Sequence, residues 1–180
     1  MAAKNILSLL AGGDRRSIGR ADEVAAAVSR NPRLFSELME GLWSEDPLVR
    51  MRAADAAEKV TRTDTPLLQP YKKQLLGLLA EAVEQELRWH LAAMVPRLRL
   101  SAAERRSASA ELRRYLGDPS SIVRTFALQG LADLAQDDLK MRAGVVELLR
   151  EACRSGTPAM KARGRKLLGR FVRLRVQNQT

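Results

Sequence analysis

The sequence predicts an all-α fold of stacked helical hairpins, an α-solenoid, over a single domain that spans residues 1–180. Three observations support this prediction. A short phrase recurs four times along the chain, and apolar residues recur at helical intervals after each copy. Ala and Leu supply most of the apolar content, whereas aromatic residues make up only 4%, a composition that suits helix packing better than sheet stacking.

The repeated phrase places a basic residue directly after an aliphatic one. Successive copies of this residue are 38, 36 and 37 positions apart, and they are Arg50, Arg88, Arg124 and Lys161. A period of this length is typical of one helical hairpin per repeat. The four residues could form a basic ladder across the repeats. Arginine at a helix flank also pairs with helix-end carbonyls or carboxylates such as Asp118, and we prefer this structural interpretation.

The expected elements follow from this register. A helical cap at 1–30 holds short helices at 4–11 and 21–30, and a basic tail at 173–180 ends the chain. Four hairpins lie between them, with boundaries at 31–62, 66–98, 101–136 and 138–172. The first helix of each hairpin is an amphipathic stretch, and these stretches are 32–43, 71–82, 102–116 and 139–153. Each copy of the repeated phrase then begins the second helix.

Helix starts are marked by capping residues. Asp46 and Thr157 each precede a proline, which is favoured at the first helical position because its missing N–H would have no partner there. Ser101 with Glu104 has the spacing of a capping box. These patterns predict helices that begin at 47, 102 and 158.

The phrase at 46–54 is Asp-Pro-x-Val-Arg-x-x-Ala-Ala. It resembles the second-helix motif of HEAT and related armadillo-like repeats, and the resemblance covers about residues 31–172. It implies a right-handed α-α superhelix whose second helices line a concave surface. The chain also resembles bacterial HEAT-repeat proteins that carry no assigned activity. Because such solenoids host many functions, the resemblance predicts architecture and leaves the function open.

The composition limits the classes of protein to which this chain can belong. The formal net charge is +10, which favours association with polyanions or acidic protein surfaces. Cys153 is the only cysteine, so an intrachain disulfide framework is excluded. We find no convincing secretion signal and no apolar window long enough to span a bilayer. A soluble protein of the cytoplasm is therefore expected, with no membrane insertion.

The inventory of catalytic and metal-binding residues is poor. His90 is the only histidine, so an ordinary zinc site cannot be assembled from one chain. A nucleophilic pair of Cys153 and His90 would need residues about two repeats apart to converge, whereas repeats contact mainly their neighbours. We therefore expect no metal, no cofactor and no catalytic residue. An enzyme with unrecognised chemistry remains the third and least favoured hypothesis.

A candidate protein-binding surface lies on the side of the second helices opposite Val49 and its equivalents. It holds Met51 and Trp89, with Ala93 and Pro96 beside Trp89 in an apolar patch. Trp89 could anchor a partner helix or peptide there. It could equally fold sideways against a neighbouring repeat and belong to the core.

A second candidate surface is the last helix. Seven basic residues and no acidic residue lie between 157 and 180. Five of them are expected to gather opposite the apolar face, and these are Lys161, Arg165, Lys166, Arg170 and Arg173. Such a stripe could bind the phosphates of nucleic acid, but a polar cap is also required at every solenoid end. We prefer the capping interpretation.

The leading hypothesis is thus a noncatalytic scaffold or adaptor that binds an unknown protein partner through its concave face. The alternative is a nucleic-acid-associated protein that binds phosphates through the basic helix.

Overall fold

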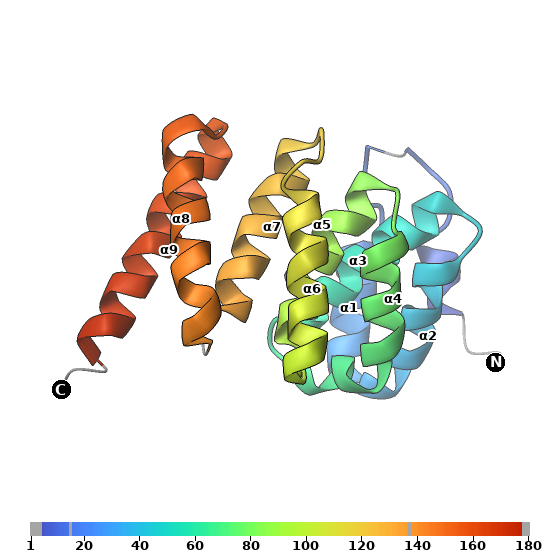
Figure 1. The fold of residues 1–180 in the computed structure, drawn as a ribbon. Helices are drawn as coiled ribbons and strands as arrows, with labels where there is room; N and C mark the ends of the chain where they lie inside the picture. The colour runs from blue at the N-terminus through green and yellow to red at the C-terminus, as the bar shows by residue number, and fades with distance from the viewer. Residues whose placement is uncertain (1–4, 15, 137, 178–180) are drawn as a thin grey trace. The chain divides into compact units, whose positions relative to one another are not determined.

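The computed structural model describes residues 5–14, 16–136 and 138–177, with side chains described as far as Arg173. Every regular element within these ranges is a helix, and the ranges contain no strand (Figure 1). The predicted all-α class is therefore confirmed. The chain divides into two compact units, Met1–Lys72 and Lys73–Thr180. The expected second hairpin, 66–98, spans this division.

The first unit is built around α3, which runs from Pro47 to Thr61. Its N-cap is Asp46, whose carboxylate accepts a hydrogen bond of 2.8 Å from the Leu48 amide, so the predicted start is confirmed. α1 and α2 both pack against α3. The other elements of this unit are η1 (Ile6–Leu9), α1 (Ala21–Arg30), η2 (Pro32–Leu34), α2 (Phe35–Glu40), η3 (Gly41–Trp43) and η4 (Thr65–Tyr71).

Two expectations for the first unit are corrected. The helix expected over 4–11 is a single 3₁₀ turn, and its residue 4 lies outside the described residues. The helix expected over 32–43 is broken into 3₁₀, α and 3₁₀ segments. Pro32 opens it with a 3₁₀ turn, and the α-helix ends before Gly41, a residue type with a poor intrinsic preference for helix.

The second unit holds the helices from α4 onward, and its packing is centred on α7. α5 lies against α7, α7 against α9, α6 against α7, and α8 against α9 (Figure 1). The elements are α4 (Lys72–Glu81, whose first residue precedes the division), α5 (Gln85–Met94), η5 (Val95–Arg97), α6 (Ala102–Tyr115), α7 (Ser121–Leu134), α8 (Leu139–Ser155) and α9 (Pro158–Gln177). α9 continues through residues 173–177, which we expected as a tail; residues 178–180 lie outside the described residues.

The packing follows the predicted apolar register. Leu87 and Val123, the equivalents of Val49, are buried in the second unit. The capping box of Ser101 and Glu104 is present in both directions. α5 and α7 approach closely at Gly130, where an added Cβ would lie 2.7 Å from the carbonyl oxygen of Ala92. Only glycine permits this contact without a shift of the helices.

Among the described residues, no helix is both long enough and apolar enough to cross a membrane.

Candidate functional site

Three side chains form a continuous row across α5, α7 and α9. The rings of Trp89 and Phe126 have centroids 5.0 Å apart and planes inclined by 36°. Arg163 Cζ lies 5.5 Å from the centroid of the Phe126 ring, within the range of a cation–π contact. All three side chains are half-buried. We call these three residues, Trp89, Phe126 and Arg163, the aromatic row. Each side chain packs against the helices on one side and exposes part of its surface to solvent.

Polar contacts between α7 and α9 hold one end of this row. Arg163 Nη1 donates to Gln129 Oε1 at 2.8 Å. The Gln129 amide donates in turn to both carboxylate oxygens of Asp133, at 2.9 and 3.0 Å. Arg170 Nη1 donates to Asp133 Oδ1 at 2.7 Å. The network orients the Arg163 guanidinium, and Arg170 neutralises Asp133.

The buried side chain of His90 packs against the aromatic row from inside the second unit. Its side chain is 1% exposed, and its ring stacks on Trp89. Nδ1 lies 2.6 Å from the carbonyl oxygen of Glu86, and since a carbonyl only accepts, Nδ1 carries the hydrogen. His90 is thus a packing residue that fixes the orientation of the Trp89 ring.

The predicted protein-binding residues are only partly brought together. Trp89 and Pro96 are half-buried in the second unit. Ala93 keeps only 9% of its surface and Ala92 is fully buried, so little of the expected apolar patch around Trp89 is open. Met51 is half-buried in α3 of the first unit. The accessible surface next to Trp89 extends instead toward Phe126.

Phe126 and Arg163 do not follow from the repeat register, which is set on Arg88, Arg124 and Lys161 and therefore places Thr125 and Ala162 at the positions equivalent to Trp89. Thr125 is 6% exposed, and its hydroxyl donates to the carbonyl of Ser121 within α7. The sequence did hold a signal: 37 residues separate Trp89 from Phe126, and 37 separate Phe126 from Arg163. This spacing matches the length of the repeat. When the repeats are aligned on their basic residue, however, Phe126 of α7 falls one position after the equivalent of Trp89 in α5.

The five residues of the predicted anion-binding stripe differ in their surroundings. Arg165, Lys166 and Arg173 are exposed, whereas Lys161 and Arg170 are half-buried. The Arg170 guanidinium already forms an ion pair with Asp133. Lys166 and Arg173 lie three residues after Arg163 and Arg170 respectively, on the same edge of α9. Of the exposed residues, Lys166 therefore lies next to Arg163 of the aromatic row, and Arg173 lies next to Arg170.

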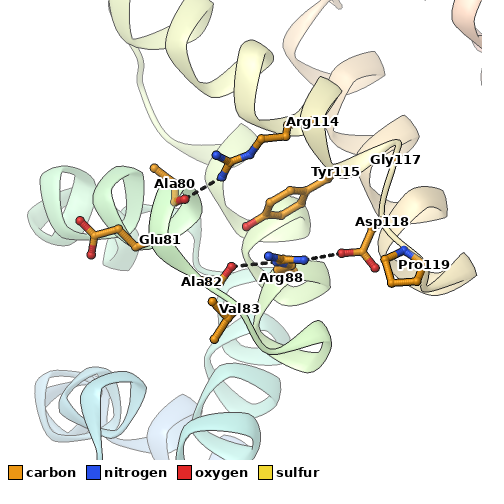
Figure 2. Close-up of a pocket in the computed structure, with 10 residues that line it drawn as sticks. All are labelled: Ala80, Glu81, Ala82, Val83, Arg88, Arg114, Tyr115, Gly117, Asp118 and Pro119. Carbon is orange, nitrogen blue, oxygen red and sulfur yellow. Dashed lines mark hydrogen bonds and ion pairs between the residues drawn. The ribbon is translucent and has the colours of Figure 1, made fainter.

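A separate pocket of about 460 Å³ lies where α4 ends (Figure 2). An arginine and a tyrosine there donate to carbonyls in the last turn of α4, which have no partner within the helix. Arg114 Nη2 donates to Ala80 O at 2.7 Å, and the Tyr115 hydroxyl donates to Leu79 O at 2.6 Å. Burial raises the pKa of Tyr115 to about 12.

Arg88 completes this seam between hairpins. Its Nε donates to Ala82 O at 2.7 Å, and its Nη1 lies 2.6 Å from Asp118 Oδ2 (Figure 2). Arg50 acts similarly in the first unit, where its Nη1 donates to the carbonyls of Ser44 and Glu45. For Arg50 and Arg88, the structural interpretation of the basic ladder is confirmed.

Within the described ranges, no group of three or more His, Cys, Asp or Glu residues is placed to hold a metal ion. Cys153 Sγ makes a long contact of 3.9 Å to the Lys161 carbonyl. No protein-family model matches the chain, and neither a curated protein nor a solved structure matches it.

Proposed function

We propose that this protein is a noncatalytic scaffold or adaptor of the HEAT-repeat type, a right-handed α-α superhelix whose second helices form the binding face. The four-fold repeated phrase supports the repeat assignment. The side-by-side packing of α5, α7 and α9 supports a continuous layer of second helices. In such a layer, equivalent side chains from successive helices fall in a row and create an extended binding surface.

The aromatic row is the observation that carries the proposal. Trp89 and Phe126 are large side chains left half-buried in a chain with few aromatic residues. Trp and Arg are enriched among the residues that dominate protein–protein binding energy. Their partners within the unit hold Trp89 and Arg163 in place, so little side-chain entropy is lost when a ligand binds.

The charge beside the row favours an acidic protein segment. Arg163 lies against the Phe126 ring, exposed Lys166 follows it one turn along α9, and Asp133 on α7 is already paired with Arg170. A partner with one apolar anchor flanked by carboxylates would satisfy both parts of this surface.

The test is affinity capture with quantitative comparison of variants. Trp89→Ala and Phe126→Ala should each remove the same partners that the wild-type chain retains. Trp43→Ala is the matched control, because Trp43 is 47% exposed but lies in the first unit. Circular dichroism and thermal melting of each variant verify that the fold persists. Retention of every partner by folded Trp89→Ala and Phe126→Ala proteins contradicts the proposal.

Exposure of Arg165, Lys166 and Arg173 on α9 favours one alternative, a phosphate-binding surface for nucleic acid. Such binding weakens steeply with salt. The wild-type chain would be retained by a single-stranded oligonucleotide above physiological ionic strength, and a triple reversal of these residues to Glu would abolish retention. Arg163 and Arg170 are kept in this variant because they bond α7. Absence of retention by the wild type contradicts the alternative.

A further inference from the structure

Arg163 of the aromatic row differs from the other arginines that bond across helices of the second unit. Arg88, which is also half-buried, pairs with the Asp118 carboxylate at 2.6 Å. Within the described residues, the side chain of Arg163 makes no ion pair, and its hydrogen bond is to the neutral amide of Gln129. A positive charge that is partly removed from water and lacks a counter-ion favours the arrival of an anion.

Gln129 holds the Arg163 guanidinium in a fixed orientation. The Gln129 amide nitrogen donates to both carboxylate oxygens of Asp133, so its oxygen is left to accept from Arg163. Asp133 itself pairs with Arg170. The Phe126 ring lies against the guanidinium, with Cζ 5.5 Å from the ring centroid. Arg163 is therefore oriented in advance, and its remaining N–H groups are left for a ligand.

We propose that Arg163 is the carboxylate-binding residue of the aromatic row, and that the row binds an extended segment in which Asp or Glu follows an aromatic or aliphatic residue by two positions. This inference rests on the proposed function and specifies its ligand. In an extended chain, side chains two positions apart lie on one face, about 6.6 Å from each other. The similar distance between the Phe126 ring and Arg163 lets one such pair cover the ring and meet the guanidinium.

The number of charges at the row favours a carboxylate over a nucleic acid. The row itself holds one cation beside two rings, and one further exposed cation, Lys166, lies a turn along α9. A nucleic acid gains much of its affinity from a series of phosphate contacts. A carboxylate next to an apolar side chain needs only one guanidinium and a ring, because a planar arginine fork binds it through two hydrogen bonds.

Two capped peptides that differ at one position test the proposal on the full-length chain. They are acetyl-Phe-Ala-Glu-Ala-amide and its counterpart with Gln in place of Glu. In a ¹H–¹⁵N NMR titration, the indole N–H signal of Trp89 reports binding, and that of Trp43, in η3 of the first unit, is the internal reference. The glutamate peptide should shift the Trp89 signal and bind about fivefold or more tightly than the glutamine peptide, because charge-assisted hydrogen bonds are the stronger ones.

Substitutions at two positions test the roles of Arg163 and Gln129. Arg163→Gln should remove the preference for the glutamate peptide. Gln129→Glu should remove it by another route, because the introduced carboxylate pairs with Arg163 and competes with the ligand. Gln74→Glu is the matched control, since it makes the same charge change at an exposed position of α4. Circular dichroism verifies each fold. A folded Gln129→Glu chain that keeps the wild-type preference overturns the proposal.

The outcomes for the wild-type chain separate this inference from the proposed function. If both peptides shift the Trp89 signal with equal affinity, the row binds apolar groups without selecting a carboxylate, and only the inference is overturned. If neither peptide shifts it at millimolar concentration, the inference is overturned as well, and partner capture by the Trp89→Ala chain still decides the proposed function. A single-stranded oligothymidylate that binds at Trp89 more tightly than the glutamate peptide also overturns the inference and favours nucleic acid, whose bases stack on aromatic rings.

Discussion

The guanidinium of Arg52 occupies the space beside Gly19 that a side chain would fill, since an added Cβ at Gly19 would lie 2.9 Å from Arg52 Cζ. Arg52 is 2% exposed and donates to four carbonyl oxygens of the loop before α1. The distances are 2.7, 2.6, 2.9 and 3.1 Å, to Leu10, Gly12, Asp14 and Ser17. One side chain of α3 therefore satisfies the backbone of a whole loop, and glycine lets that loop pass close to it.

Substitutions at two glycines of this loop should separate backbone strain from crowding. Gly12 has φ of 71° with open space around it, whereas Gly19 has φ of 54° and contacts Arg52. Gly12→Ala should lower the free energy of unfolding by about 1–2 kcal/mol, the cost of a left-handed conformation. Gly19→Ala should cost about 1–3 kcal/mol more, because of overpacking. Chemical denaturation measures both, and equal losses would contradict the close contact.

Removal of the Arg52 guanidinium should destabilise the first unit. Arg52→Met leaves four carbonyls without their charged donor and should cost at least about 3 kcal/mol of unfolding free energy. Arg52→Lys should recover only part of this loss, because an ammonium lacks the planar fork that reaches all four oxygens. Arg30→Met is the control, since Arg30 is exposed at the end of α1. Limited proteolysis of residues 10–19 should accelerate in Arg52→Met and remain slow in the control.

The helices that follow the repeated phrase are predictable because several local signals agree. For α3, the apolar spacing, Asp46 as cap and Pro47 at the first position all indicate the same start. The segment before it is harder to predict. The sequence marks Pro32 as a helix start, yet Pro32 opens only a 3₁₀ turn. The role of Arg52 could not be predicted from the sequence either. Its partners are backbone carbonyls about 40 positions away, and residue types do not indicate which backbone carbonyls a side chain will contact.

The candidate site was predictable in outline only. Trp89 was predicted because helical periodicity places it on the side of its helix opposite Val49 and its equivalents. The contact between Trp89 and its neighbour Phe126 was not predicted, because it depends on a shift of one residue between α5 and α7. Helix packing sets this shift, and a repeat alignment does not show it. Arg170 was predicted as part of an open stripe, but a helical wheel does not show that Asp133 of α7 lies 2.7 Å away.

Breaking the ion pair of Arg88 and Asp118 should cost more than breaking a surface pair. The Asp118 side chain is only 3% exposed, and its carboxylate also accepts from the Ser120 amide at 2.8 Å. Arg88→Met would leave that buried charge without its partner and should cost about 3–5 kcal/mol of unfolding free energy. Arg154→Met, which removes an exposed partner of Glu151, should cost less than about 1 kcal/mol. Similar losses in urea denaturation would show that the buried pair contributes no more than an exposed one.

Stability should fall as pH rises through the range in which Tyr115 ionises. Burial raises the pKa of Tyr115 to about 12 in the folded chain, compared with about 10 for an unfolded tyrosine. Its contribution is fully present below about pH 10, where both states keep the proton. It is lost between about pH 10 and 12, because the unfolded chain then releases the proton first and becomes favoured. Between about pH 9 and 11 the expected loss from this residue is about 1 kcal/mol.

Tyr115→Phe isolates this contribution, because the other tyrosine, Tyr71, remains to titrate. The variant loses the 2.6 Å hydrogen bond to Leu79 O, so it should be less stable than wild type at neutral pH by about 1 kcal/mol. Its stability should then decline less steeply than wild type above about pH 10. Tyrosinate absorbance, followed through the same titration, should show one high-pH transition fewer in the variant. Parallel pH profiles for the two proteins would mean that the Tyr115 hydroxyl is not held in a buried site, and that the seam at the end of α4 is open to solvent.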